Sequence, residues 1–242
     1  MNELNLFESL PKPKRPIEKG WRKEENKKIA KLFGKDFFDG DRINGYGGYY
    51  YDGRWRMAVT KLQEVYGIDS TSSILDIGCA KGFLLYDLQE MLPGIKVAGI
   101  DISEYALDKA MEGYSRYLQK HGKEEREANL LEKKAIERVR PNIILGSAES
   151  LPWPDKYFDV VLSINTAHNL SEEKCKQAIR EMIRVGKDKK KMLISVDAYR
   201  NEQEKERMKD WVLTAETVKS VEDWLKLYRE EGYEGDYFWF IA

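Results

Sequence analysis

From about residue 73 onward, short apolar runs alternate with amphipathic stretches. The runs over 73–77, 95–100, 142–145, 158–164 and 191–196, and a last aromatic run over 237–241, are predicted as strands. Helical spacing of apolar residues is found over 54–66, 82–91, 103–119, 171–185 and 220–231. Strands that alternate with helices are typical of βαβ units. The pattern therefore predicts an α/β fold with a mostly parallel central sheet and helices on both faces.

Two segments depart from this alternation. Residues 1–45 are polar and irregular. The stretch from Lys12 to Lys31 contains nine basic and three acidic residues, which predicts a solvated arm. We therefore expect residues 1–53 to form an N-terminal arm and residues 54–242 to form a single domain. Within that domain, residues 120–140 mix both charges at helical spacing, which predicts an exposed helical insertion.

The composition narrows the class of protein. The chain has 242 residues and a net charge of −1, so no global basic field attracts a nucleic acid backbone. Two cysteines, 96 positions apart, suit a reducing compartment, and two histidines leave little material for a zinc site, so no metal is expected. No run approaches the roughly 18 apolar residues that cross a membrane. The first residues lack a signal-peptide pattern, and a cytoplasmic protein is expected.

The segment ILDIGCAKGF, residues 74–83, carries the candidate chemistry. A buried strand ends in Asp76, and Gly78 and Gly82 flank a tight turn into a helix, where a ligand can approach free backbone N–H groups. Nineteen residues after Gly82, Asp101 ends the second strand, where a carboxylate can accept both hydroxyls of a ribose.

A dinucleotide cofactor does not suit this turn. The G-x-G-x-x-G pattern would need glycines where Ala80 and Leu85 stand, so nothing is laid out for a pyrophosphate. Asp76, two places before Gly78, instead favours a ligand with a positively charged amino group near the loop. A nucleoside with an amino-acid tail fits both aspartates.

This segment resembles the first motif of the class I S-adenosylmethionine-dependent methyltransferases, Asp/Glu-x-Gly-x-Gly-x-Gly. The resemblance covers about residues 73–196, because ILGSAESLPWPDKYFDVVLSINTAHNL, residues 144–170, is similar to the family's third and fourth motifs. It implies a Rossmann-like class I methyltransferase fold with S-adenosylmethionine as cofactor. The cofactor contacts that it implies are Asp76, Gly78, Cys79, Ala80, Gly82, Asp101, Ile102, Ser147, Ala148, Glu149 and Asn165.

Three departures from the family pattern are visible. Ala80 replaces the middle glycine, which the fold should tolerate if that residue keeps ordinary dihedral angles. Ser147 stands where many relatives carry an aspartate. The family usually ends in an antiparallel strand pair, whereas only one aromatic strand is evident here, and residues 211–217 are the candidate for the other.

His168 follows the fourth strand, at the carboxyl edge where open α/β sheets bind ligands. An imidazole is a plausible general base because its pKa lies near neutrality. His168 is therefore the candidate catalytic residue. The alternative is a histidine that orders its loop or lines the pocket passively.

The segment GYGGYYYDGRW, residues 45–55, crowds four glycines and four tyrosines. Similar methyltransferases use such N-terminal elements to cover the cofactor and shape the acceptor pocket, so the resemblance implies a lid. The residues expected to contact the substrate are Tyr46, Tyr49, Tyr50, Tyr51, Arg54 and Trp55. The alternative is a set of turns packed on the core.

The leading hypothesis is methyl transfer from S-adenosylmethionine to an oxygen or nitrogen of a small-molecule acceptor. The Asn/Asp-Pro-Pro-Tyr motif, which often follows the fourth strand in relatives that methylate nucleobase amines, is replaced by Asn165-Thr166-Ala167-His168, which disfavours a nucleic acid partner. A macromolecular methyltransferase acting on RNA or protein, and a non-catalytic protein that keeps the fold as a scaffold, are the alternatives. The oligomeric state is left open.

Overall fold

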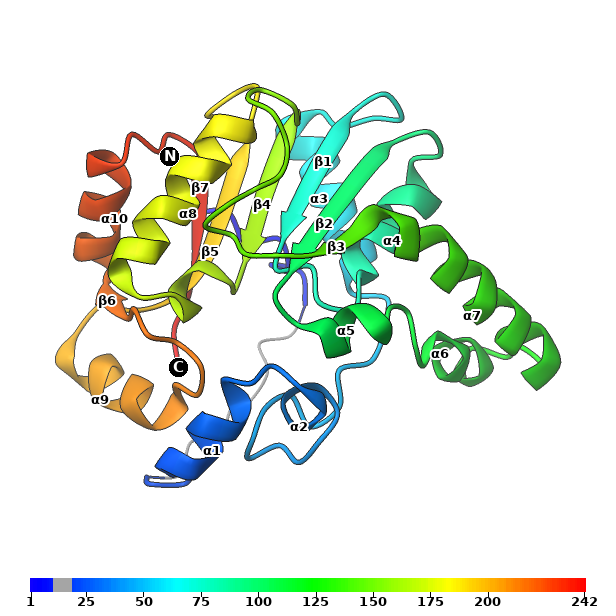
Figure 1. The fold of residues 1–242 in the computed structure, drawn as a ribbon, viewed down its shortest axis with the longest axis horizontal. Helices are drawn as coiled ribbons and strands as arrows, with labels where there is room; N and C mark the ends of the chain where they lie inside the picture. The colour runs from blue at the N-terminus through cyan, green and yellow to red at the C-terminus, as the bar shows by residue number, and fades with distance from the viewer. Residues whose placement is uncertain (11–18) are drawn as a thin grey trace.

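Seven parallel strands form one sheet in the computed structural model, which describes residues 1–10 and 19–242 (Figure 1). Hydrogen-bonded neighbours follow the order β3-β2-β1-β4-β5-β6, and β7 pairs with β5 beside β6. The strands are β1 (Ser73–Ile77), β2 (Lys96–Asp101), β3 (Ile143–Leu145), β4 (Val160–Ile164), β5 (Met192–Tyr199), β6 (Lys219–Ser220) and β7 (Asp236–Phe240). The predicted parallel α/β architecture is confirmed.

Helices connect the strands and cover both faces of the sheet. Those before and within the first half are α1 (Glu24–Ala30), α2 (Lys35–Phe38), α3 (Trp55–Tyr66), α4 (Phe83–Met91), α5 (Glu104–Asp108), α6 (Tyr114–Lys120) and α7 (Glu125–Val139). Two short 3-10 turns are η1 (Arg140–Asn142) and η2 (Ala167–Asn169), and the later helices are α8 (Glu172–Val185), α9 (Glu202–Trp211) and α10 (Val221–Glu230). In the described part of the chain, none of the helices is both long and apolar enough to cross a bilayer.

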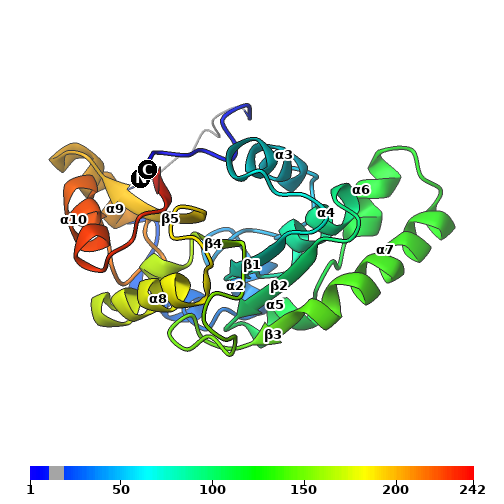
Figure 2. The same cartoon turned by 90° about the horizontal axis from the view of Figure 1, so that it is seen from above.

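Side-chain alternation along the strands builds two cores. In β1, Ile74 faces the layer of α3 and α4, whereas Leu75 and Ile77 face α8 and α10, as the two-residue period of a strand requires. Figure 2 shows these two helical layers on opposite sides of the strands. Trp224 and Tyr228 of α10 are fully buried in the second core.

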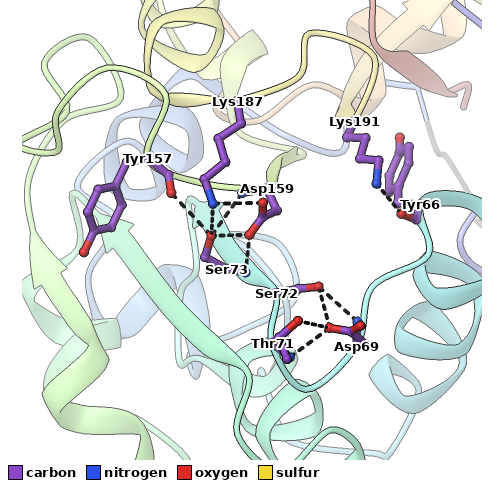
Figure 3. Close-up of polar contacts among 9 residues, drawn as sticks. All are labelled: Tyr66, Asp69, Thr71, Ser72, Ser73, Tyr157, Asp159, Lys187 and Lys191. Atoms are coloured by element: carbon purple, nitrogen blue, oxygen red, sulfur yellow. Dashed lines mark hydrogen bonds and ion pairs between the residues drawn. The ribbon is translucent and has the colours of Figure 1, made fainter.

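Polar contacts fix the register of β1 against β4 at their amino ends (Figure 3). The carboxylate of Asp159 accepts hydrogen bonds from the N–H and hydroxyl of Ser73 at 2.8 and 2.6 Å and pairs with Lys187 at 2.9 Å. Burial opposes ionisation of Asp159, but the bonds from Ser73 and Lys187 outweigh it and lower the pKa of Asp159. Nearby, Lys191 donates to the carbonyl of Tyr66 at 2.8 Å, which holds the end of α3 beside β5.

Three expectations about secondary structure were wrong. The helix expected over 103–119 is broken into α5 and α6, because Met111 (φ +57°) and Gly113 (φ +88°) take left-handed conformations. Residues 211–217 form no strand, since Trp211 ends α9. The final strand β7 runs parallel to β5, and no antiparallel pair joins the named strands of the described chain.

Residues 1–10 and 19–53 are more ordered than the predicted irregular arm, and residues 11–18 of that prediction lie outside the described residues. Leu4 and Leu6 are buried against α3, and the N–H of Leu4 donates to Tyr237 of β7 at 2.8 Å. Further along, α1 and α2 lie below the carboxyl ends of the strands, on the same side of the molecule as α5 and α9 (Figure 1). Phe38 of α2 is buried there. This segment therefore roofs the edge of the sheet where the candidate residues gather.

Candidate functional site

A cavity of about 1540 Å³ opens between the carboxyl edge of the sheet and the N-terminal segment. Its floor is built by residues that follow β1, β2 and β4, and its other walls come from the segment before α3 and from residues around α9 and β7. Pockets for single small ligands usually measure about 300–1,000 Å³. The cavity therefore has room for two ligands side by side.

The turn after β1 is shaped by Gly78. Its φ is +82°, and a Cβ there would lie 1.9 Å from the Thr166 hydroxyl oxygen, so only glycine fits. The N–H groups of Gly78 and Cys79 donate to the carbonyl of Ile100 at 2.7 and 3.2 Å. These bonds hold the loop against β2. Burial, with the Asp76 and Asp101 charges, raises the pKa of the Cys79 thiol well above its usual value, which makes it unreactive.

Asp101 ties the ends of β1 and β2 together. Its carboxylate accepts from the N–H of Ala80 at 2.8 Å and from the N–H of Ser103 at 2.7 Å. In this contact Ala80 has φ +47°, so the condition of ordinary dihedral angles is not met and the turn holds a left-handed alanine. A left-handed alanine costs about 1–2 kcal/mol. Its methyl group packs in a cluster with Phe38 of the N-terminal segment and Ala106 of α5.

Two strand-end carboxylates give the cavity floor its electrostatic character. Asp76 is 5% exposed, and burial together with the Asp101 charge raises its pKa to about 7. Burial also raises the pKa of Asp101, although its backbone hydrogen bonds oppose the shift. Within the described chain, no basic side chain pairs with either carboxylate. A cationic group of a ligand would supply the missing charge.

Most of the predicted site residues lie on the cavity wall. From the predicted cofactor set these are Asp76, Gly78, Cys79, Ala80, Asp101, Ile102, Ser147, Ala148 and Asn165. From the predicted substrate set they are Tyr46, Tyr49, Arg54 and Trp55. The structure thus brings both sets to one cavity.

Four predicted site residues lie off the cavity wall. Gly82 has φ +72° and a Cβ there would meet Val139 of α7 at 2.5 Å, so this glycine serves the packing of α4 against α7. Glu149 accepts from the Ser147 hydroxyl at 3.0 Å and pairs with Lys174. The structure places both residues in protein contacts, off the cavity wall.

The other two are tyrosines of the glycine-rich segment. Tyr51 is buried and donates to Asp87 at 2.6 Å in an aromatic cluster with α6. The ring of Tyr50 is 46% exposed and contacts the cations of Lys81 and Arg116, at 5.6 and 5.2 Å from its centroid. The segment is therefore divided: Tyr46 and Tyr49 line the cavity, whereas Tyr50 and Tyr51 pack on the body of the protein.

His168 is buried in η2 and its geometry does not support a general base. Its Nδ1 accepts the backbone N–H of Asp197 at 2.9 Å, and burial lowers the pKa of the imidazole, with the Asp197 charge opposing the shift. A neutral imidazole has only one acceptor nitrogen, so Nε2 carries the proton. The ring then has no free nitrogen that could accept a proton from a substrate. The carbonyl of His168 accepts from the N–H groups of Glu216 and Thr217, which indicates that it orders the loop after α9.

A buried ion pair fastens the N-terminal segment over the site. Lys81, in the turn after β1, is 1% exposed and pairs with Asp39 at 2.7 Å. Asp39 also accepts from the hydroxyl of Tyr105 at 2.8 Å and from the N–H of Tyr49 at 3.2 Å. Removing one partner of such a pair costs about 3–5 kcal/mol, because the other charge is left buried and uncompensated. The segment that roofs the cavity is thus bonded directly to the loop that forms its floor.

Sequence reasoning missed the residues at the far wall of the cavity. Asp197 lies near the carboxyl end of β5, so the strand-end rule that selected Asp76 and Asp101 could have found it. Arg22, Arg42 and Trp211 also line the cavity, but they come from a charge-rich arm and an unpredicted helix. Nothing in their local pattern marked them.

The β1 turn and two strand-end aspartates open onto one cavity at the carboxyl edge of a parallel sheet. This is the place where open α/β sheets bind their ligands. The model of the methyltransferase domain family matches residues 68–234, and the chain belongs to that family. Membership of this family implies S-adenosylmethionine as the cofactor.

Individual relatives are distant. An uncharacterized methyltransferase of Schizosaccharomyces pombe is 32% identical over 94 residues, which span 39% of this chain and 29% of that protein. Among solved structures, the YcgJ protein of Bacillus subtilis has a TM-score of 0.47 and 20% identity over 72% of this chain and 66% of its own. A SAM-dependent methyltransferase from Aquifex aeolicus has a TM-score of 0.36 and 24% identity over 53% of this chain and 58% of its own.

The role of Gly82 can be tested against a glycine of the same conformation. Gly67 has φ +65° with open space at its Cβ, so Gly67→Ala carries only the backbone cost of about 1–2 kcal/mol. Gly82→Ala adds the clash with Val139, and overpacking of this kind costs a further ~1–3 kcal/mol. Urea unfolding should show the larger loss for Gly82→Ala, and Val139→Ala should recover part of it in a double-mutant cycle. Equal losses at the two glycines would contradict the packing role.

The raised pKa of Asp76 predicts pH-dependent affinity for a cationic ligand. The carboxylate is ionised above its pKa of about 7 and neutral below it, so affinity should fall as the pH is lowered. Calorimetric titration with S-adenosylhomocysteine between about pH 7.5 and 5.5 should show up to a roughly tenfold loss per pH unit below neutrality. Asp76→Asn should bind more weakly and with a flatter profile. A wild-type affinity that does not change over this range would exclude the charge contact.

Proposed function

We propose that the protein transfers the methyl group of S-adenosylmethionine to a small-molecule acceptor that binds beneath the N-terminal segment. The observation that carries the proposal is the enclosure of one large cavity by the β1 turn on one side and the aromatic segment before α3 on the other. Tyr46 and Tyr49 face this cavity. Their position supports an acceptor pocket next to the cofactor.

The cavity floor suits the cofactor. Two buried carboxylates with raised pKa complement a ligand that carries an ammonium and a sulfonium. In this proposal Asp76 lies toward the amino-acid part, Asp101 holds the ribose, and Ile102, 62% exposed at the mouth, covers the adenine. Ala148 and Asn165 also line the cavity. Ser147 offers a hydroxyl group at the position where many relatives carry an aspartate.

The chain's own residues would mainly position the acceptor and exclude water. The sulfonium of the cofactor supplies an activated methyl group, so alignment of nucleophile and methyl is the protein's task. The hydroxyl of Tyr46, on the cavity wall, can donate a hydrogen bond to the acceptor. Because Nδ1 of His168 is occupied, a neutral amine acceptor fits the site without a base, whereas a hydroxyl acceptor would need a different proton acceptor.

The size of the acceptor distinguishes this proposal from its main alternative, a methyltransferase that acts on RNA or protein. Purified protein would be incubated with methyl-labelled S-adenosylmethionine and a cell extract that has been divided by ultrafiltration into small-molecule and macromolecular fractions. Label should enter the small-molecule fraction. Lys81→Met, which leaves Asp39 unpaired and loosens the roof, should reduce this transfer more than it reduces S-adenosylhomocysteine binding.

Two outcomes would contradict the proposal. Label found only in RNA or protein would establish the macromolecular alternative. Absence of label from every fraction, by folded protein that binds S-adenosylhomocysteine, would favour a scaffold. Asp108→Asn, which changes a charged residue that does not line the cavity, provides the control.

A further inference from the structure

Two arginines share one tryptophan at the far wall of the cavity. The guanidinium of Arg22 lies 5.3 Å from the ring centroid of Trp211, and that of Arg42 lies 5.9 Å from the same centroid. Arg22 also stacks on Trp21 at 5.1 Å. Stacking on rings fixes the planes of both guanidinium groups and leaves their N–H edges available for hydrogen bonds.

The positive charge of this pair is under-compensated. Within the described chain, neither Arg22 nor Arg42 forms an ion pair; each donates to a backbone carbonyl, of Trp211 and of Gly45 respectively. The Nε of Arg22 is buried without a hydrogen-bond partner. Burial, and then the neighbouring charge of Arg42, lower the pKa of Arg22 to about 10, against a smaller opposing effect of Asp197. A buried, unpaired donor and two like charges together point to an anionic ligand.

The pair lies away from the carboxylates of the cofactor floor. Arg22 donates to the carbonyl of Trp211 in α9, and α9 packs against β5, whereas Asp76 and Asp101 lie near the ends of β1 and β2. Arg54 is distinct from this pair, because its guanidinium is already bonded to Asp52 at 2.5 Å.

We propose that Arg22 and Arg42 bind an anionic oxygen group of the acceptor, a carboxylate or a phosphate, at the β5 end of the cavity. The forked guanidinium donors match the paired oxygens of either group. This inference rests on the proposed function, because only that function makes the anionic ligand the methyl acceptor. It narrows that acceptor to an anion whose nucleophile faces the cofactor floor while its charged end contacts the arginines.

NMR spectroscopy of the arginine side chains detects the contact directly. The Nε–H resonances of Arg22 and Arg42 would be assigned from the spectra of Arg22→Lys and Arg42→Lys. Protein saturated with S-adenosylhomocysteine, and protein without it, would then be titrated with benzoate and with phenyl phosphate, which separate the two anion chemistries. Benzamide, an uncharged molecule of similar shape, is the control ligand.

At least one of the two anions should shift both resonances saturably, and benzamide should not. Arg42→Gln, followed at the Arg22 resonance, should weaken the anion by about tenfold or more, as expected for loss of a charge-assisted contact. Arg22→Lys, followed at Arg42, provides a second variant that keeps the charge and removes the fork. Arg229→Gln, an exposed arginine of α10, should leave the affinity unchanged.

The proposal fails if neither anion shifts the two resonances up to its solubility limit, or if the arginine variants bind the anion as the wild type does. It also fails if S-adenosylhomocysteine alone shifts both resonances and abolishes the response to anions, because the pair would then hold the carboxylate of the cofactor. Absence of S-adenosylhomocysteine binding in the same samples would instead refute the proposed function. The titration without cofactor still decides whether the anion site exists.

Discussion

The carboxylate of Asp101 holds the site together, because it joins two strand ends that parallel pairing alone leaves open. One oxygen accepts from Ala80 in the turn after β1, and the other accepts from Ser103 at the start of α5. The turn that results places Lys81 toward Asp39, and Ser103 donates its hydroxyl to Phe33 at 2.5 Å. Asp101 therefore holds the turn on the cavity floor directly, and it contacts the roof through Ser103.

The charged side chains are unevenly placed along the cavity, although Asp197 also lies on its wall at the β5 end. Asp76 and Asp101 lie on the floor, where burial raises the pKa of each, and Arg22 and Arg42 gather at the β5 end. An acceptor with an anionic group would be oriented by this division, because it is attracted to one end and repelled from the other. The reacting atom would then face the methyl donor. Orientation of this kind is the main contribution that a protein makes when its cofactor is already activated.

The sequence was informative wherever the structure follows local rules. The strand pattern and the strand-end rule located β1, β2 and β4 and the acids Asp76 and Asp101, because two-residue periodicity and the carboxyl edge of a parallel sheet are local consequences of the chain. The left-handed Ala80 was not predictable, since its conformation depends on the distant carboxylate of Asp101. The packing role of Gly82 likewise depends on Val139, 57 positions away.

The least predictable part was the roof. Residues 19–45 read as a solvated arm because their charges dominate the pattern, yet Phe38 and Ala30 are buried and Asp39 pairs with a buried lysine. These contacts join segments far apart in the sequence and have no periodic signature. Helix α9 was not predicted either, because its sequence is polar and shows no periodic pattern of apolar residues. The roof of the cavity is therefore known from the structure alone.

The most direct test of the account is a calorimetric titration of the folded protein with S-adenosylhomocysteine. The account predicts micromolar or tighter binding that weakens by about tenfold or more in Asp101→Ala, because the ribose hydroxyls lose their acceptor. Asp159→Asn, at the opposite edge of the sheet, should bind as the wild type does. Absence of binding by folded wild-type protein, or binding that is unchanged in Asp101→Ala, would contradict the account.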